Sequence, residues 1–127
     1  AVAVAPVTHW KFYDNIYTER YNGLPQDNPA GYDKGSPLSY VDRMRGRLLL
    51  VHGTGDDNVH YQNSENLLNR LVAANKTFDF MAYPNRNHGI FGGNTTLHLR
   101  TLITNFIDET LGPPRSLPPG GPGPLTN

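Results

Sequence analysis

The sequence predicts an α/β fold in which helices cover both faces of a parallel sheet. The run Leu48–Val51 is apolar without alternation and has the length of a strand buried on both faces. Two further short runs, over residues 1–7 and 77–83, also have strand character. Apolar residues at helical spacing follow the central run and the run over 77–83. The alternation of strands and helices is that of a right-handed parallel sheet.

The first part of the chain predicts one strand, a long loop and one short helix. Residues 1–7 form a buried strand that ends at Pro6, because proline cannot donate to a strand ladder. Residues 22–37 are rich in turn-forming residues and predict a surface loop. Ser36 followed by Pro37 is typical of an N-cap and a first-turn proline, so a short helix is expected over 37–43.

The second part of the chain predicts two strands that are each followed by an amphipathic helix. The central strand covers 47–52, and leucines at helical spacing predict a helix over 61–74. A strand over 77–83 stops at Pro84. Apolar residues at helical spacing then predict a long helix from Thr95 to Leu111.

Three strands with two open edges make a poor domain by themselves. Residues 1–111 are therefore expected to be part of a larger α/β domain. Residues 112–127 are dominated by proline and glycine and predict a disordered tail, with partial polyproline II character and the role of a linker or terminal extension.

Composition excludes several classes of function. Eleven Lys and Arg residues balance eleven Asp and Glu residues, so no charge bias favours nucleic acid or an anionic membrane surface. The chain has no cysteine, which excludes disulfides, thiolate catalysis and thiolate metal sites. No apolar stretch approaches the ~20 residues that span a bilayer.

An aromatic stripe follows the first strand. Trp10, Tyr13, Tyr17 and Tyr21 recur at i, i+3, i+7 and i+11, which places them along one side of a helical or nearly helical segment. Such a stripe usually packs in a core. Because this one directly follows a strand end, it also suits the wall of a binding pocket. Both interpretations stay open from the sequence alone.

An acid and a histidine follow successive strands. Gly53-Thr54-Gly55 ends the central strand in a sharp turn, and Asp56 comes directly after it. His88 follows the strand over 77–83. Reactive groups gather beyond the carboxyl ends of the strands in open α/β sheets. An acid after one strand and a histidine after the next is the order of the last two members of an α/β-hydrolase triad.

Two alternatives accompany this assignment. Asp57 could replace Asp56 as the acid if the loop slipped by one residue, but Asp57 is better suited to a loop position or to the N-cap of the next helix. A histidine metal site is the second alternative, and neither the spacing of the histidines nor the absence of cysteine favours it. The histidines are His9, His52, His60, His88 and His98. No metal and no cofactor is predicted.

The nucleophile of such a triad is missing from these residues. None of the four serines lies in a Gly-x-Ser-x-Gly turn after a strand; they are Ser36, Ser39, Ser64 and Ser116. Without that turn, neither a nucleophile nor the backbone donors of an oxyanion hole are present. The chain alone is therefore expected to be inactive.

Several stretches resemble the C-terminal part of the catalytic domain of the dipeptidyl peptidase IV branch of the prolyl oligopeptidase family. They are Val4–Trp10, Tyr17–Pro25, His52–His60 and His88-Gly89, and together they lie within residues 1–111. The tyrosine-rich stretch and Asp56-Asp57-Asn58-Val59-His60 are the most specific. This resemblance implies an α/β-hydrolase fold and a serine peptidase.

The resemblance also implies a role for individual residues. Asp56 and His88 match the acid and the base of the catalytic triad. Asn58 matches a residue that hydrogen-bonds a substrate carbonyl, and Arg20 matches an arginine near the substrate. The apolar pocket for the proline or alanine before the scissile bond is matched by Val7, Trp10, Tyr13, Tyr17 and Val59. Flat aromatic walls suit a pyrrolidine ring and exclude branched side chains.

The sequence therefore predicts part of a serine exopeptidase that releases N-terminal X-Pro or X-Ala dipeptides. The resemblance implies that the partners are a peptide substrate and upstream parts of the same protein (the serine turn and a β-propeller). Because relatives commonly dimerise through this domain, a homodimer is a further expectation. It also suggests a periplasmic, membrane-anchored or extracellular location. Two alternatives remain open: an esterase or acylaminoacyl peptidase of the same fold, and a non-catalytic remnant or interaction module.

Overall fold

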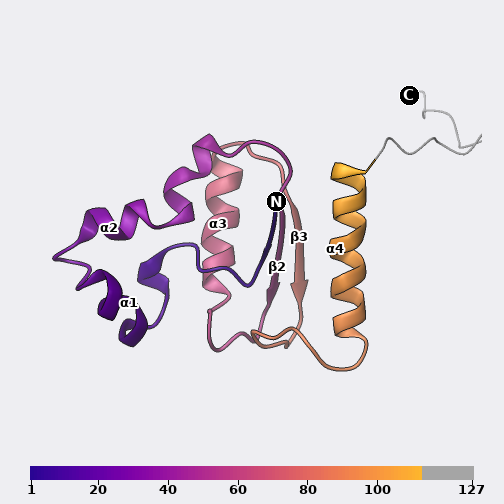
Figure 1. Cartoon of the computed structure of the whole chain (residues 1–127), viewed down its shortest axis with the longest axis horizontal. Helices are drawn as coiled ribbons and strands as arrows, with labels where there is room; N and C mark the ends of the chain where they lie inside the picture. Colours follow the sequence, from indigo (N-terminus) through magenta and orange to yellow (C-terminus); the bar gives the residue numbers. More distant parts are fainter. Residues whose placement is uncertain (113–127) are drawn as a thin grey trace, which may run out of the picture.

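A computed structural model describes residues 1–112 and contains one parallel sheet. Its three strands are β1 (Val2–Val4), β2 (Leu49–Gly53) and β3 (Asp79–Tyr83), which lie side by side in chain order. Figure 1 shows β2 and β3 with their arrowheads at the same end of the molecule. The predicted parallel α/β architecture and the three predicted strands are confirmed, but β1 is not buried as expected: it lies at the edge of the sheet, and Val4 is 41% exposed.

Two helices cover opposite faces of the sheet. The helix α3 (Gln62–Ala73) lies on one side of the strands, and α4 (Thr95–Leu111) lies on the other (Figure 1). Because side chains alternate along a strand, β2 contributes to two cores. Leu49 and Val51 pack in the core that α4 covers, and Leu50 packs in the core that α3 covers.

Different residues pack against β2 on the two faces of the sheet. On the α4 side, the buried cluster consists of Leu49, Val51, Tyr83, Ile90, Leu99 and Phe106. On the α3 side, it consists of Val41, Leu50, Leu67 and Leu71. The three β2 leucine and valine side chains are at most 2% exposed, as expected for a strand buried on both faces.

The segment between β1 and β2 holds short helices only. It contains two 3-10 helices, η1 (Trp10–Phe12) and η2 (Pro37–Arg43), and two α-helices, α1 (Asn15–Asn22) and α2 (Pro29–Lys34). Figure 1 shows α1 and α2 away from the sheet, beyond α3. The helix predicted over 37–43 is therefore present, in 3-10 form.

Two details of this segment differ from the sequence prediction. Residues 22–37 were expected to be loop, but they contain α2, which the Asn28 side chain caps by accepting from Gly31 N. Proline at the first helical position and burial of Tyr32 stabilise this short helix. Ser36 makes no side-chain cap. Its hydroxyl bonds to Tyr32 O and Trp10 N instead.

The remaining boundaries lie close to their predictions. The helix expected over 61–74 spans Gln62–Ala73, and the long helix spans Thr95–Leu111 as predicted. The tail predicted over 112–127 lies outside the described residues, apart from Gly112. Among the described residues, no helix combines the length and apolarity needed to cross a membrane.

Candidate active site

The loops that follow β2 and β3 are joined at the carboxyl edge of the sheet. Thr54 N donates to Tyr83 O at 3.0 Å, and Gly55 N donates to Arg86 O at 3.0 Å. A side chain at Gly53 would meet Arg86 O at 2.2 Å, so only glycine permits this approach. The two loops therefore form one unit that holds the predicted acid and the predicted base together.

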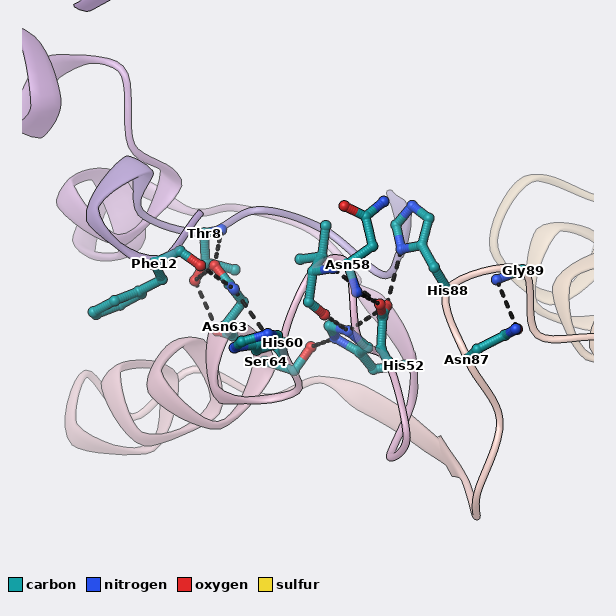
Figure 2. A network of polar contacts seen from close by, with 12 residues as sticks. Thr8, Phe12, His52, Asn58, His60, Asn63, Ser64, Asn87, His88 and Gly89 are labelled. Carbon is teal, nitrogen blue, oxygen red and sulfur yellow. Dashed lines mark hydrogen bonds and ion pairs between the residues drawn. The ribbon is translucent and has the colours of Figure 1, made fainter. Parts of the chain in front are cut away.

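Asp56 and His88 make a direct hydrogen bond. His88 Nδ1 lies 2.9 Å from Asp56 Oδ2. Because a carboxylate only accepts, Nδ1 carries the proton, which leaves Nε2 of the neutral ring as a base. Figure 2 shows the second ring nitrogen of His88 directed away from the dashed contact. The side chain of His88 is 42% exposed, so Nε2 is accessible to a reactant.

Asp56 itself is buried and receives four hydrogen bonds. Its Oδ1 accepts from Asn58 N at 3.0 Å and from Val59 N at 2.9 Å. Its Oδ2 faces His88 Nδ1 and, at 3.1 Å, His52 Nε2. Burial by itself raises the pKa of Asp56, but the hydrogen bonds from His88, Asn58 and Val59 and the charge of His88 hold it below its ordinary value. Asp56 is therefore a charged and fully paired carboxylate.

Asp57 takes no part in this arrangement. Asp57 is exposed and lies in the turn between β2 and α3. It is not the N-cap of α3, since that helix begins at Gln62 with Tyr61 in the capping position. Of the two adjacent acids, the geometry brings only Asp56 to His88.

His52 is a third member of the site that sequence reasoning missed. It follows Val51 on β2, so its side chain points to the α3 face of the sheet together with Leu50. There His52 Nδ1 lies 2.7 Å from Ser64 Oγ (Figure 2). The signal available in the sequence was a polar residue at the end of an otherwise apolar buried strand, since such a residue needs partners.

The series Ser64, His52 and Asp56 has the composition of a triad but cannot be the reactive one. Ser64 and His52 are both 0% exposed, so no substrate can reach the serine hydroxyl. The Ser64 contact is also made to Nδ1 of His52, while Nε2 faces Asp56. These three residues therefore form a buried support for the site.

The loop that carries His88 is anchored on both sides of it. Arg86 Nε donates to Thr95 Oγ1 at 3.0 Å, which attaches the loop to the first turn of α4. Ile90 is 1% exposed in the α4-side core although its φ of 48° is unusual for a β-branched residue. Burial of the Ile90 side chain thus holds a strained backbone two residues after the histidine.

The aromatic stripe forms a continuous row of ring contacts. Trp10 stacks on Tyr17 with a centroid distance of 6.2 Å, and Tyr13 meets Tyr17 edge-on at 5.6 Å. Tyr17 and Tyr21 follow at 4.9 Å. The stripe does not lie on a single helix, because Tyr13 is extended between η1 and α1. Tyr17 is 49% and Tyr21 67% exposed, which favours a surface wall over core packing.

Few hydrogen bonds connect this aromatic wall to its surroundings. Trp10 Nε1 donates to Gly35 O at 3.0 Å, and Trp10 N donates to Ser36 Oγ at 3.1 Å. Tyr13 Oη donates to Asn58 Oδ1 at 3.1 Å, which joins the wall to the loop that holds Asp56. The acid loop and the aromatic wall therefore meet at Asn58.

Asn63 is a second residue that sequence reasoning missed. Its buried side chain accepts from Thr8 N at 3.0 Å and donates to Phe12 O at 3.2 Å and His60 O at 3.1 Å. Thr8 Oγ1 in turn donates to Asn63 O at 2.7 Å. Figure 2 shows this group beside the His52 network. An asparagine in the first turn of a helix gave no sequence signal for such long-range contacts.

The other predicted site residues have different settings. Val59 is buried beside Asp56, Val7 is half-buried after β1, and Arg20 is exposed on α1 with its guanidinium 6.0 Å from the Tyr21 ring. Asn58 is exposed. Within residues 1–112, no group of three or more metal-ligating side chains is close enough to hold a metal ion.

Comparisons with known proteins identify relatives with this arrangement of sequence and fold. The sequence model of the prolyl oligopeptidase family matches residues 1–114. The chain is 47% identical to the probable dipeptidyl-aminopeptidase B of Uncinocarpus reesii over 109 residues, which cover 84% of this chain and 12% of that protein. It is 41% identical to dipeptidyl peptidase 4 of Felis catus over 116 residues, which cover 89% of this chain and 15% of that protein.

Solved structures agree with the sequence relatives. The crystal structure of Porphyromonas gingivalis dipeptidyl peptidase 4 superposes with a TM-score of 0.85 at 45% identity, covering 87% of this chain and 16% of that one. The chain thus spans a small part of the relatives it matches. The α/β-hydrolase fold and the resemblance to the dipeptidyl peptidase IV branch are confirmed. The chain belongs to the prolyl oligopeptidase family.

Proposed function

We propose that this chain supplies the acid, the base and the apolar pocket of a serine exopeptidase that releases N-terminal dipeptides. The observation that carries this proposal is the 2.9 Å hydrogen bond between His88 Nδ1 and a buried, fully paired Asp56. Both groups lie at the carboxyl edge of a parallel sheet, where α/β enzymes place their reactive groups.

The geometry suits general base and then general acid catalysis. His88 Nε2 takes the proton of a serine hydroxyl as that oxygen attacks the peptide carbonyl. The charged Asp56 stabilises the imidazolium that forms. His88 then gives the proton to the leaving amine, and an acyl-enzyme remains until water hydrolyses it. Asp56 keeps its negative charge throughout, because its pKa lies below the ordinary value.

The aromatic wall suits a small cyclic or unbranched side chain. In this proposal, the rings of Trp10, Tyr13 and Tyr17 line the pocket for proline or alanine together with Val7 and Val59. The centroids of the three aromatic rings lie 5.6 to 6.4 Å from one another, so the rings pack together as one wall. Asn58 hydrogen-bonds a substrate carbonyl, and Arg20 lies near the substrate. A rigid flat wall favours a pyrrolidine ring by shape.

The nucleophile belongs to an upstream part of a longer protein in this proposal. Among the described residues, β1 is an edge strand, and an apolar groove of about 530 Å³ runs beside it. The groove is lined by Ala3, Pro6, Thr8, Pro37, Tyr40, Val41, Arg43, Met44, Leu48 and Leu67. We place residues 1–111 in the catalytic domain, whose remaining strands continue the sheet at β1, and residues 112–127 in a separate tail. A homodimer is a further possible assembly.

The test is the hydrolysis of a Gly-Pro amide by the full-length protein that carries this chain. His88→Ala removes the base, so kcat is expected to fall by about 10⁴-fold or more. The matched control is His98→Ala, since His98 also hydrogen-bonds through Nδ1, to Tyr83 Oη, but lies on α4. The control is expected to keep most of the activity.

A fluorophosphonate probe separates the alternatives. In the full-length protein it is expected to label one serine upstream of Ala1, and in the isolated 127-residue chain it is expected to label none. Near-normal hydrolysis by His88→Ala would contradict the proposal. Preference for esters or acylated amino acids over dipeptidyl amides would indicate the related esterase or acylaminoacyl peptidase, and an unlabelled full-length protein would indicate a non-catalytic module.

A further inference from the structure

We propose that His52 is a positioning residue that holds the Asp56 carboxylate in place for His88, and that Ser64 fixes the His52 ring in the required tautomer. This inference rests on the function proposed above. It adds two residues of β2 and α3 to the acid–base unit, neither of which contacts the reacting atoms.

The hydrogen bonds around His52 define its tautomer. Its Nε2 lies 3.1 Å from Asp56 Oδ2 and 2.8 Å from Val59 O, and both of these atoms only accept. The proton of the neutral ring is therefore on Nε2. Its Nδ1 lies 2.7 Å from Ser64 Oγ and accepts from that hydroxyl. Every polar atom of the His52 ring thus has a partner.

Burying these polar groups costs free energy that an apolar side chain at position 52 would avoid, so packing alone does not account for the histidine. His52, Ser64 and the Asp56 side chain are 0% exposed. A leucine would continue the apolar pattern of β2 toward α3 and would bring no polar group into the core. A histidine at this position requires a buried hydroxyl on α3 and a buried carboxylate in the loop, so three polar groups depend on one another.

His52 can hold Asp56 in a way that His88 cannot. The main-chain N–H groups of Asn58 and Val59 fix only Oδ1, so the position of Oδ2 depends on the two histidines. His88 lies on a loop with its side chain 42% exposed, and it must exchange protons with reactants. His52 is fully buried on the α3 face of the sheet and is also held by Ser64 Oγ and Val59 O. It therefore keeps Oδ2 directed at His88 throughout the reaction.

Within residues 1–112, the titratable side chains in contact with His52 or its partner Asp56 are His88 from the loop after β3 and Tyr61, whose ring centroid lies 5.6 Å from that of His52. Burial, followed by the charge of Glu65, raises the pKa of Tyr61, so its phenol stays neutral. A change at His52 is thus transmitted through Asp56.

Two variants in the full-length protein separate positioning from packing. In His52→Gln, the side-chain amide nitrogen is as far along the side chain as Nε2 and can still donate to Asp56. In His52→Asn, the shorter amide reaches only the position of Nδ1 next to Ser64, so the donor to Asp56 is lost. Both variants remove the imidazole, and His98→Asn is a control on α4.

The first readout is carbethoxylation of His88 by diethyl pyrocarbonate, followed by mass spectrometry over a range of pH. It needs no serine nucleophile, so it remains informative if the proposed peptidase function fails. Without the His52 donor, Oδ2 is no longer held toward His88, so the carboxylate stabilises the protonated form of His88 less. The pH of half-maximal modification is therefore expected to move downward in His52→Asn and to return toward the parent value in His52→Gln.

The second readout is the hydrolysis of a Gly-Pro amide. His52→Asn is expected to lower kcat by about 10- to 100-fold, the loss expected for one hydrogen bond to a charged group, with KM changed less than about twofold. His52→Gln is expected to restore most of this loss. Ser64→Ala is expected to add nothing to His52→Asn, because both act on the same donor.

Thermal unfolding is measured for every variant, so that a folding defect is recognised. Equal modification curves for the parent and both His52 variants would overturn the inference, as would a displacement that His52→Gln does not reverse. Loss of kcat by the same factor in both variants would show that the imidazole only packs against α3. An unlabelled serine with a displaced His88 curve would refute the proposed function and leave the positioning role supported.

Discussion

The two halves of the candidate site are built in opposite ways. The acid–base half lies on the ends of β2 and β3, and Asp56 is 6% exposed with four hydrogen bonds to its carboxylate. The aromatic half lies on η1, α1 and the residues between them, and Tyr17 is 49% exposed. One half is a buried polar network, and the other is an open row of rings.

In the proposed function, this difference matches the role of each half. A charge that stabilises a transition state must be fixed before the reaction, since reorienting it costs free energy at that moment. An apolar wall selects by shape and becomes dry only when substrate covers it. Substitutions in the acid–base half are therefore expected to lower kcat, whereas substitutions in the aromatic half are expected mainly to raise KM.

The strongest test of this comparison is Asp56→Asn. The amide can no longer hold His88 in the required tautomer as a carboxylate does, so kcat for a Gly-Pro amide is expected to fall by about 10⁴-fold. KM is expected to stay nearly constant. The measurement is steady-state kinetics of the full-length protein that carries this chain.

Asp57→Asn is the matched control for this change. It makes the same chemical replacement at the adjacent, exposed acid. It is expected to keep most of the activity. If the two variants lost similar activity, or if Asp57→Asn lost more, the assignment of the acid to Asp56 would be wrong.

The next largest effect is expected from Asn63→Ala. This change leaves the buried Thr8 N without its acceptor and Phe12 O without its side-chain donor, whereas His60 O still accepts from the main-chain N of residue 63. The free energy of unfolding is expected to fall by about 2–3 kcal/mol. Because these contacts hold the segment that leads to the wall, KM for the Gly-Pro amide is expected to rise more than kcat falls.

Asn69→Ala on the exposed side of the same helix is the control, measured by denaturant unfolding and by kinetics. It is expected to change the free energy of unfolding by less than about 0.5 kcal/mol. An Asn63→Ala variant that lost kcat with KM unchanged would remove the distinction between the two halves.

The sequence predicted the fold and the acid–base pair better than it predicted their supports. An unbroken apolar run located β2 and helical periodicity located α4, since burial on two faces or on one leaves a pattern in the chain. Asp56 and His88 were found because the ends of neighbouring parallel strands meet. His52 and Asn63 were missed because their partners are distant or face inward, and no local pattern encodes those contacts.

The low pKa of Asp56 predicts a smaller effect on stability. Since the folded state holds this carboxylate charged more firmly than the unfolded state, it binds fewer protons in acid. The contribution to stability is complete above the unfolded pKa of about 3.9 and is lost as the pH falls through the folded pKa. Asp56→Asn is therefore expected to flatten this part of the stability curve, by less than the Asn63 effect.

This acid dependence is measured as the free energy of unfolding of the parent and of Asp56→Asn between pH 2 and pH 6. The difference between the two proteins is expected to shrink as the pH falls. A difference that is constant over this range would show that Asp56 has the same pKa in the folded and unfolded states.

The smallest effect is expected from Tyr13→Phe, at the point where the two halves meet. Burial, followed by the charge of Asp14, raises the pKa of Tyr13, so its phenol remains a donor to Asn58 Oδ1 at neutral pH. With that oxygen occupied by Tyr13, the Asn58 amide nitrogen is left to donate to the substrate carbonyl of the proposed function. Loss of the hydroxyl is expected to lower kcat/KM by about three- to tenfold.

Tyr21→Phe is the control, because Tyr21 lies at the far end of the wall and is 67% exposed. It is expected to have no measurable effect on kcat/KM for the Gly-Pro amide. If Tyr13 acts only by orienting Asn58, then Tyr13→Phe adds no loss to Asn58→Ala. Additive losses would instead mean that the Tyr13 hydroxyl contacts the substrate itself, and the aromatic half would then contribute a polar group as well as a shape.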